Sequence, residues 1–127
     1  MPNAPCHIIV EGNLAVIYAS RHGSPKRMLP ILLPFLEKFW QERETSGEFA
    51  DTPECLVAQI IVRFGFEICE DDYSNLRVGV NYYRPDAAYL YQIGTDQKVK
   101  IWVPAPSYLQ SPSLGLAGCR EWVPEPI

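Results

Sequence analysis

Two histidines and four cysteines are the side chains best suited to metal binding or nucleophilic chemistry. They are Cys6, His7, His22, Cys55, Cys69 and Cys119. No two cysteines form a C-x-x-C pair, and the spacing matches no zinc module. Cysteines in a chain without export signals are usually reduced and often buried. We therefore predict no metal and no cofactor. The alternative is a mixed site of Cys6, His7, His22 and Cys119, which requires a fold that gathers them.

Arg21, His22 and Gly23 follow an apolar segment and precede a predicted helix. In this setting the tripeptide resembles the opening signature of the histidine phosphatase family. The resemblance implies a phosphate-handling site in which the arginine holds a phosphate and the histidine attacks it. The family also has a second catalytic histidine downstream, whereas this chain has no histidine after His22. It also lacks the alternating β and α segments of a parallel α/β sheet. A surface turn is the favoured interpretation.

An acidic cluster offers oxygen ligands of the kind that hard cations require. Its members are Glu67, Glu70, Asp71 and Asp72. EF-hand spacing is absent, and no second acidic cluster completes a cage. Solvated loop charges, or recognition of a basic patch on a partner, explain the cluster more simply. No serine sits in a G-x-S-x-G elbow and no glycine-rich phosphate loop occurs. We predict no catalytic residues, and the chain is more consistent with a protein that is not an enzyme.

Basic and aromatic side chains recur along the predicted strands of the C-terminal half. Those expected on one sheet face are Arg77, Asn81, Tyr83, Lys98, Lys100 and Trp102. Cations between aromatic rings can stack on bases or hold an extended peptide, although ordinary cross-strand packing gives the same composition. The formal net charge is −4, and an acidic protein repels phosphate backbones at long range. If this face binds anything, we expect a protein or a small aromatic ligand, not a nucleic acid.

The length of 127 residues fits a single domain, 1–127, with an ordinary core. No apolar segment approaches the roughly 20 residues that a bilayer crossing requires, and the first residues show no signal-peptide pattern. We expect no membrane association and a cytoplasmic location.

The N-terminal half predicts a β-hairpin and a first helix. Residues 6–10 and 14–20 are apolar segments around a glycine-containing turn, which is typical of a hairpin. Ser24 followed by Pro25 predicts a helix start, and apolar residues then recur at three- and four-residue steps. Because Pro30 and Pro34 each remove a backbone hydrogen bond, we expect a kinked or late-starting helix that becomes regular from Ile31 and ends near residue 44.

A second helix is predicted after residue 51, where capping residues and an early proline occur. Residues 56–68 nevertheless also alternate as a strand would. We favour a helix to about Phe64, terminated by Gly65, with a strand beginning at residues 66–69.

The C-terminal half predicts three strands at 76–83, 87–93 and 98–103, joined by turns as a meander. Val80 is expected in the core, so that Val80→Asp should unfold the domain. Residues 104–127 contain five prolines and no periodicity. We predict an irregular tail that packs on the domain or on a partner through Tyr108 and Trp122.

These elements define an α+β fold: an antiparallel β-meander and an N-terminal β-hairpin, with two helices packed on one face. The sequence best fits a non-catalytic protein-interaction or regulatory domain that self-associates as a homo-oligomer. The alternative is a small-molecule-binding protein or an enzyme of unfamiliar type, including a phosphate-handling site at Arg21 and His22.

Overall fold

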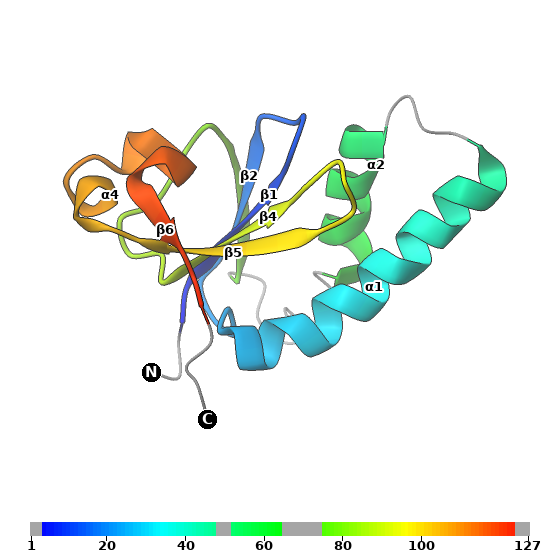
Figure 1. Ribbon diagram of the computed structural model, residues 1–127, viewed down its shortest axis with the longest axis horizontal. Coiled ribbons are helices and arrows are strands. Elements are labelled where there is room, and N and C mark those ends of the chain that lie inside the picture. Colours follow the sequence, from blue (N-terminus) through cyan, green and yellow to red (C-terminus); the bar gives the residue numbers. More distant parts are fainter. Residues whose placement is uncertain (1–3, 48–51, 65–74, 124–127) are drawn as a thin grey trace.

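The computed structural model describes residues 4–47, 52–64 and 75–123. They form a six-stranded sheet with helices on both sides (Figure 1). The strands are β1 (Cys6–Val10), β2 (Ala15–Ala19), β3 (Leu76–Val80), β4 (Tyr89–Ile93), β5 (Val99–Pro104) and β6 (Cys119–Glu121). Their order across the sheet is β3-β2-β1-β4-β5-β6. All of these neighbours are antiparallel except β1 and β4, which are parallel. The predicted α+β class is confirmed, with a mostly antiparallel sheet.

Strands β1 and β2 form the predicted N-terminal hairpin, with Ile8 opposite Ile17. Gly12 in its turn has a φ of 93°, which suits glycine. Asn13 stabilises the turn, since its side-chain oxygen accepts a hydrogen bond from the Ala15 N–H at 2.8 Å. Both strands are largely buried on both faces, and this explains why their sequences are continuous apolar segments rather than alternating ones. The hairpin prediction is confirmed.

The three predicted C-terminal strands are present, but they do not form the expected meander. Strand β3 pairs with β2, and β4 pairs with β1, so the hairpin lies between β3 and β4. The predicted β4–β5 pairing is present. A meander added to one side of the hairpin would leave β1 or β2 at the sheet edge, where an apolar strand is a liability. The observed order buries both strands, and the predicted β3–β4 pairing is wrong.

Helix α1 (Pro25–Ser46) starts well before Ile31, where the sequence predicted regular helix to begin. Pro30 and Pro34 lie inside it, on the exposed side. Each proline lacks the N–H that would bond the carbonyl four residues earlier, and on this side water can hydrate that carbonyl instead. The helix begins at Pro25, as Ser24 and Pro25 predict, and accommodates both internal prolines. Of the two expected alternatives, the late start is wrong. Gly47 ends the helix with a left-handed φ of 73°.

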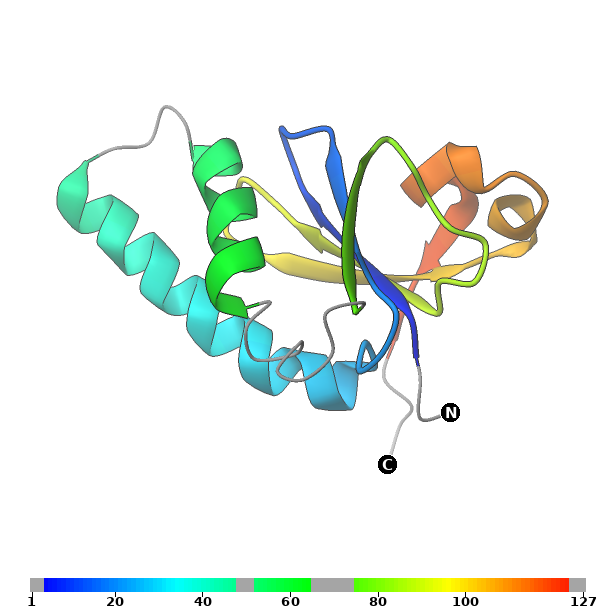
Figure 2. The same ribbon diagram turned by 180° about the vertical axis from the view of Figure 1, so that it is seen from behind.

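The second predicted helix is confirmed, which resolves the helix-or-strand ambiguity for residues 56–64. Helix α2 (Thr52–Gln59) continues as a turn of π-helix, η1 (Ile60–Phe64). Helices α1 and α2 cover one face of the sheet, as predicted (Figure 2). The core that they share with the sheet includes Ile8, Ile17, Met28, Leu36, Leu56, Ile60 and Tyr91. Gly65, the expected strand at 66–69 and the acidic cluster at 67–72 lie outside the described residues.

The opposite face of the sheet is covered by the segment that the sequence predicted to be irregular. It forms helix α4 (Pro106–Gln110), a 3-10 segment η2 (Pro112–Gly118) and strand β6. Sequence periodicity could not reveal elements this short, so the irregular-tail prediction is wrong for residues 106–121. Tyr108 is fully buried on this face, against β1, β2 and β4. No helix in the described part of the chain is long and apolar enough to cross a membrane.

Candidate functional site

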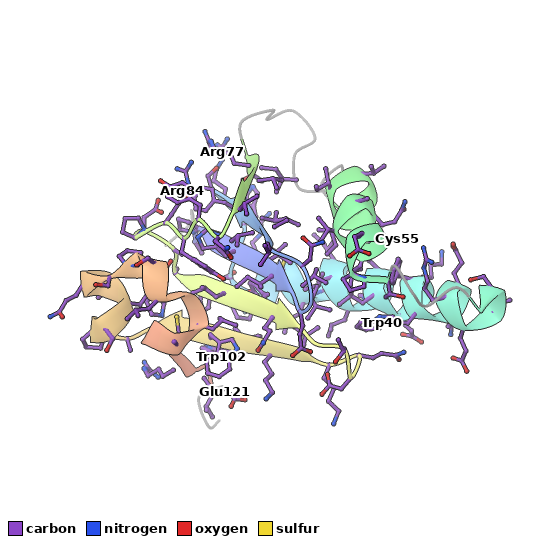
Figure 3. All side chains as sticks on the ribbon, turned by 90° about the horizontal axis from the view of Figure 1, so that it is seen from above. Trp40, Cys55, Arg77, Arg84, Trp102 and Glu121 are labelled. Atoms are coloured by element: carbon purple, nitrogen blue, oxygen red, sulfur yellow. The ribbon has the colours of Figure 1, made fainter. Side chains whose placement is uncertain are left out.

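The structure separates the residues that the sequence placed on one sheet face. Arg77 lies on β3, whereas Lys98, Lys100 and Trp102 lie on β5 or immediately before it. Three strands separate β3 from β5, and a spacing of about 4.8 Å per strand puts the two groups roughly 19 Å apart. Figure 3 shows Arg77 and Arg84 near one edge of the sheet and Trp102 towards the other. The six residues do not form one site.

The aromatic members of that set have structural contacts. Tyr83 is half-buried, with its ring edge towards His7 at 5.5 Å between centroids. Trp102 donates its indole N–H to the Gln92 side-chain oxygen at 3.1 Å, which links β5 to β4. Asn81 is exposed at the end of β3 and has a φ of 53°.

The two residues predicted to dock the tail lie against this chain's own sheet. The Tyr108 hydroxyl donates a hydrogen bond to the Arg84 carbonyl at 2.5 Å. Trp122 is partly buried against the main core, and its backbone N–H donates to the Ile101 carbonyl at 2.8 Å.

Strand β3 is an edge of the sheet, and its apolar side chains are exposed. Val78 and Val80 are 52% and 68% exposed. They point to the face that carries the main core, because Val78 lies opposite the buried Ile17, but at this edge the helices leave them uncovered. The prediction that Val80 belongs to the core is wrong. Val80→Asp is therefore not expected to unfold the domain.

Within the described part of the chain, the backbone of β3 pairs on one side only. The Asn75 carbonyl accepts a hydrogen bond from the Ser20 N–H, and the Asn81 N–H donates to the Leu14 carbonyl. Because backbone groups alternate in direction along a strand, residues 77 and 79 also face β2. The N–H and C=O groups of Leu76, Val78 and Val80 therefore point away from the sheet, where no described strand lies.

A groove runs beneath β3 on the opposite face of the sheet, with a cavity volume of about 460 Å³. Its lining consists of His7, Val16, Tyr18, Arg77, Val78, Gly79, Tyr82 and Arg84. We call this cavity the β3 groove. Strands β1, β2 and β3 and the loop after β3 contribute to it. Residues far apart in the sequence therefore meet there.

His7 forms part of the floor of the β3 groove, and its hydrogen bonds fix one tautomer of the neutral ring. Its Nε2 accepts a hydrogen bond from the Arg84 backbone N–H at 2.9 Å, so its Nδ1 carries the proton that faces the Ile17 carbonyl at 3.2 Å. Burial lowers the pKa of His7, and the Ile17 bond opposes that shift in part. With both ring nitrogens occupied, His7 fixes the groove floor and is not available as a base or metal ligand.

Arg84 is the best-positioned cation of the β3 groove. Its guanidinium lies 4.4 Å from the centroid of the Tyr18 ring and 5.7 Å from that of Tyr82. Within the described part of the chain, the guanidinium has no hydrogen-bond or ion-pair partner. The Tyr18 hydroxyl donates to Asp86 at 2.9 Å. Burial and this bond raise the pKa of Tyr18 to about 12.

The Arg21-His22-Gly23 segment does not assemble a histidine pair. His22 has a φ of 67°, and its Nδ1 is buried without a hydrogen-bond partner in the described structure. Burial, Arg27 and Arg21 lower the pKa of His22. The other histidine, His7, is occupied at both ring nitrogens and cannot serve as its catalytic partner.

The cysteines are not gathered either. Burial raises the pKa of the Cys6 thiol to about 12 and that of Cys119 to about 11. Cys55 on α2, labelled in Figure 3, contacts the Arg43 guanidinium of α1. Cys69 lies outside the described residues. Among the residues that are described, no three His, Cys, Asp or Glu side chains come close enough to share a metal ion.

A smaller cavity of about 230 Å³ lies between α1, α2 and the turn after β4. Trp40, Pro53 and Leu56 give it a mainly apolar wall. Its carboxylate, Glu11, is already bonded to the Thr95 N–H and hydroxyl at 2.8 and 3.0 Å. The β3 groove contains two guanidinium groups, of Arg77 and Arg84, that have no hydrogen-bond or ion-pair partner among the described residues. It is the stronger candidate for ligand binding.

No family model, no curated protein and no solved structure matches this chain. The β3 edge and the β3 groove are therefore interpreted from their own geometry.

Proposed function

We propose that this chain is a non-catalytic interaction domain that self-associates through the outer edge of β3. The observation that carries the proposal is the row of outward-facing backbone groups of Leu76, Val78 and Val80, flanked by exposed valine side chains. Extended partners commonly bind an exposed sheet edge through such groups. A second copy of the same strand is the occupant that the β3 sequence suits best.

Two-fold pairing of β3 about Val78 gives a favourable register. Residue 76 then lies opposite residue 80 of the second copy, and Val78 lies opposite its own counterpart. All outward-facing residues become hydrogen-bonded pairs, and each pair exchanges two bonds, for about six main-chain hydrogen bonds. The valines and Leu76 would form one continuous apolar strip across the interface.

The same register avoids repulsion between like charges. Arg77, the one charged residue of β3, lies opposite Gly79 of the second copy, which has no side chain to obstruct it. If the two-fold axis were moved by one residue, from Val78 to Arg77, Arg77 would lie opposite its own counterpart. Like charges directly opposite each other destabilise a sheet. Register and charge therefore favour the same two-fold arrangement.

A non-catalytic role agrees with the state of the groups most suited to chemistry. The ring nitrogens of His7 are both bonded to backbone groups. Cys6 is completely buried, and burial disfavours its thiolate. Both residues contribute to packing in the centre of the sheet.

The proposal is tested by the molar mass of the purified full chain, measured by light scattering across a concentration series. Val78→Pro removes an outward-facing N–H without removing a bond to β2, so the variant should remain folded and become monomeric. Val78→Ile keeps the N–H and the apolar surface, and it should associate like the original chain.

A second pair of variants distinguishes association through the β3 edge from nonspecific association through any exposed apolar side chain. Val80→Asp should weaken self-association, whereas Leu109→Asp should not, although Leu109 on α4 is also well exposed, at 60%. A chain that is monomeric at every concentration would contradict the proposal. Equal loss of association in the Val80 and Leu109 variants would also contradict it.

A further inference from the structure

We infer that the β3 groove binds a small organic carboxylate, held between the guanidinium groups of Arg84 and Arg77. The inference does not depend on self-association, because every residue in it comes from one chain. The cavity volume of about 460 Å³ falls within the range of known small-molecule sites.

Arg84 is oriented before any ligand arrives. Its backbone N–H is bonded to His7 and its carbonyl to the Tyr108 hydroxyl, which fixes the position of the main chain. The guanidinium carbon lies 4.4 Å from the Tyr18 ring centroid and 5.7 Å from that of Tyr82, and these cation–π contacts restrict where the guanidinium can lie. Its N–H groups have no acceptor within the described residues, so they are open to a ligand. A planar fork of donors matches the geometry of a carboxylate.

Asp86 does not neutralise this donor edge. Its carboxylate accepts a hydrogen bond from the Tyr18 hydroxyl, and it makes no ion pair with Arg84 in the described structure. Arg77, from β3, faces the same cavity and is exposed. Within the described residues, neither Arg77 nor Arg84 is ion-paired or hydrogen-bonded to an anionic side chain.

The charge balance selects a singly charged ligand. Arg77 and Arg84 bring two positive charges to the groove lining, and His7 is neutral. Asp86 is not part of the lining, but its carboxylate, 2.9 Å from the Tyr18 hydroxyl, adds one negative charge beside the groove. The remaining single positive charge matches one carboxylate better than a doubly charged phosphate. Val16 and the exposed ring of Tyr82 supply apolar surface, so a carboxylate on a planar apolar body suits the groove best.

The proposed dimer would add to this site without creating it. In the two-fold register the Arg77 of a second copy lies over Gly79, which lines the same groove. Self-association should therefore tighten carboxylate binding. The monomeric Val78→Pro variant should still bind, with lower affinity, so the failure of one proposal is distinguishable from the failure of the other.

The test is a titration of the isotope-labelled full chain with benzoate, followed by the backbone amide signals of Gly79 and Arg84. Benzoate should shift these signals in a saturable way, and benzamide, which has the same shape without the charge, should not. Arg84→Gln should weaken benzoate binding about ten-fold or more, the effect expected for loss of a charged hydrogen-bond donor. Arg120→Gln, on the exposed strand β6, is the matched control and should leave binding unchanged.

Several results would overturn the inference. Equal shifts with benzoate and benzamide would show that charge is not recognised. Unchanged benzoate affinity in Arg84→Gln would remove Arg84 from the site. Tighter binding of phenyl phosphate than of benzoate, at the same amides, would refute the assignment to a carboxylate. Because Arg84→Gln could disturb the stacked tyrosines, Arg77→Gln provides a second variant: its residue is exposed, and its loss should weaken benzoate binding by a smaller factor.

Discussion

The two edges of the sheet differ in how they are protected against further strands. Strand β6 is three residues long, and its Arg120 and Glu121 are exposed. Figure 3 shows Glu121 on the edge opposite Arg77. Short length and charged side chains are common means by which proteins protect a sheet edge. Strand β3 is five residues long, with one charge, a glycine and two exposed valines.

Within the described residues, β3 therefore has almost none of the usual edge protection. An exposed apolar edge strand is either an interaction surface or an aggregation hazard. Its outward backbone groups and its self-compatible register favour the first interpretation. The following predictions test whether position at the β3 edge, and not residue type, decides the behaviour of these side chains.

The largest difference in the free energy of unfolding is expected between substitutions of two neighbouring residues on the same sheet face. Ile17 and Val78 are directly opposite each other on β2 and β3, but Ile17 is fully buried and Val78 is about half exposed. Ile17→Ala should lower the free energy of unfolding by about 2–5 kcal/mol, because it leaves a cavity in the core. Val78→Ala should change it by less than about 0.5 kcal/mol.

Urea unfolding of the two variants, measured under conditions where the chain is monomeric, checks this contrast. Comparable losses would mean that β3 is covered and that the difference between the two edges does not exist.

Local sequence patterns predicted most of the elements correctly. The hairpin, both major helices and the strands at residues 76–80, 89–93 and 99–104 follow from apolar periodicity and turn residues. These signals act over a few residues, and each element therefore appears in the sequence itself. Ser24 and Pro25 correctly predicted where α1 begins. Whether Pro30 and Pro34 would delay the regular helix was not predictable, because the effect of a proline depends on whether the unpaired carbonyl faces water, which is a property of the fold.

Strand order was not predictable from the same signals. Alternation in β3 correctly indicated that Val78 and Val80 share a face, yet it could not show that β3 lies at an edge. The candidate site depends on that order. Tyr18, Arg77 and Arg84 meet in the β3 groove because β3 pairs with β2, and in the sequence Tyr18 lies far from the two arginines. Adjacent basic and aromatic residues in the sequence suggested a surface, but it was assigned to the wrong pair of strands.

An intermediate effect on the free energy of unfolding is expected from lowering the pH, because His7 contributes to packing beside β3 in its neutral form. His7 has a lowered pKa because it is buried, so the unfolded chain binds a proton more readily than the folded one. The contribution of neutral His7 to the free energy of unfolding is complete above the unfolded-state pKa of about 6.5. It is lost as the pH falls towards the lower folded-state pKa. Protonation at Nε2 would also break the bond from the Arg84 N–H.

Urea unfolding at about pH 7 and about pH 5.5, on either side of the reference value, measures this dependence. His7→Gln should flatten it, whereas the control His22→Gln should retain the part due to His7. An identical pH dependence in His7→Gln and the original chain would show that His7 does not couple the β3 side to pH.

The smallest effect is expected from Arg77, and it tests the register of self-association. If Arg77 lies opposite Gly79 of the second copy, Arg77→Gln removes no contact between like charges, and the dissociation constant should change by less than about two-fold, or about 0.4 kcal/mol. If instead the strands pair so that Arg77 faces its own counterpart, the substitution removes a repulsion of about 0.2–1 kcal/mol per pair and should tighten the dimer. Sedimentation equilibrium of the two proteins at low ionic strength, where screening is weakest, distinguishes these outcomes. A tighter Arg77→Gln dimer would exclude the two-fold register about Val78, while leaving β3 as the edge through which the copies meet.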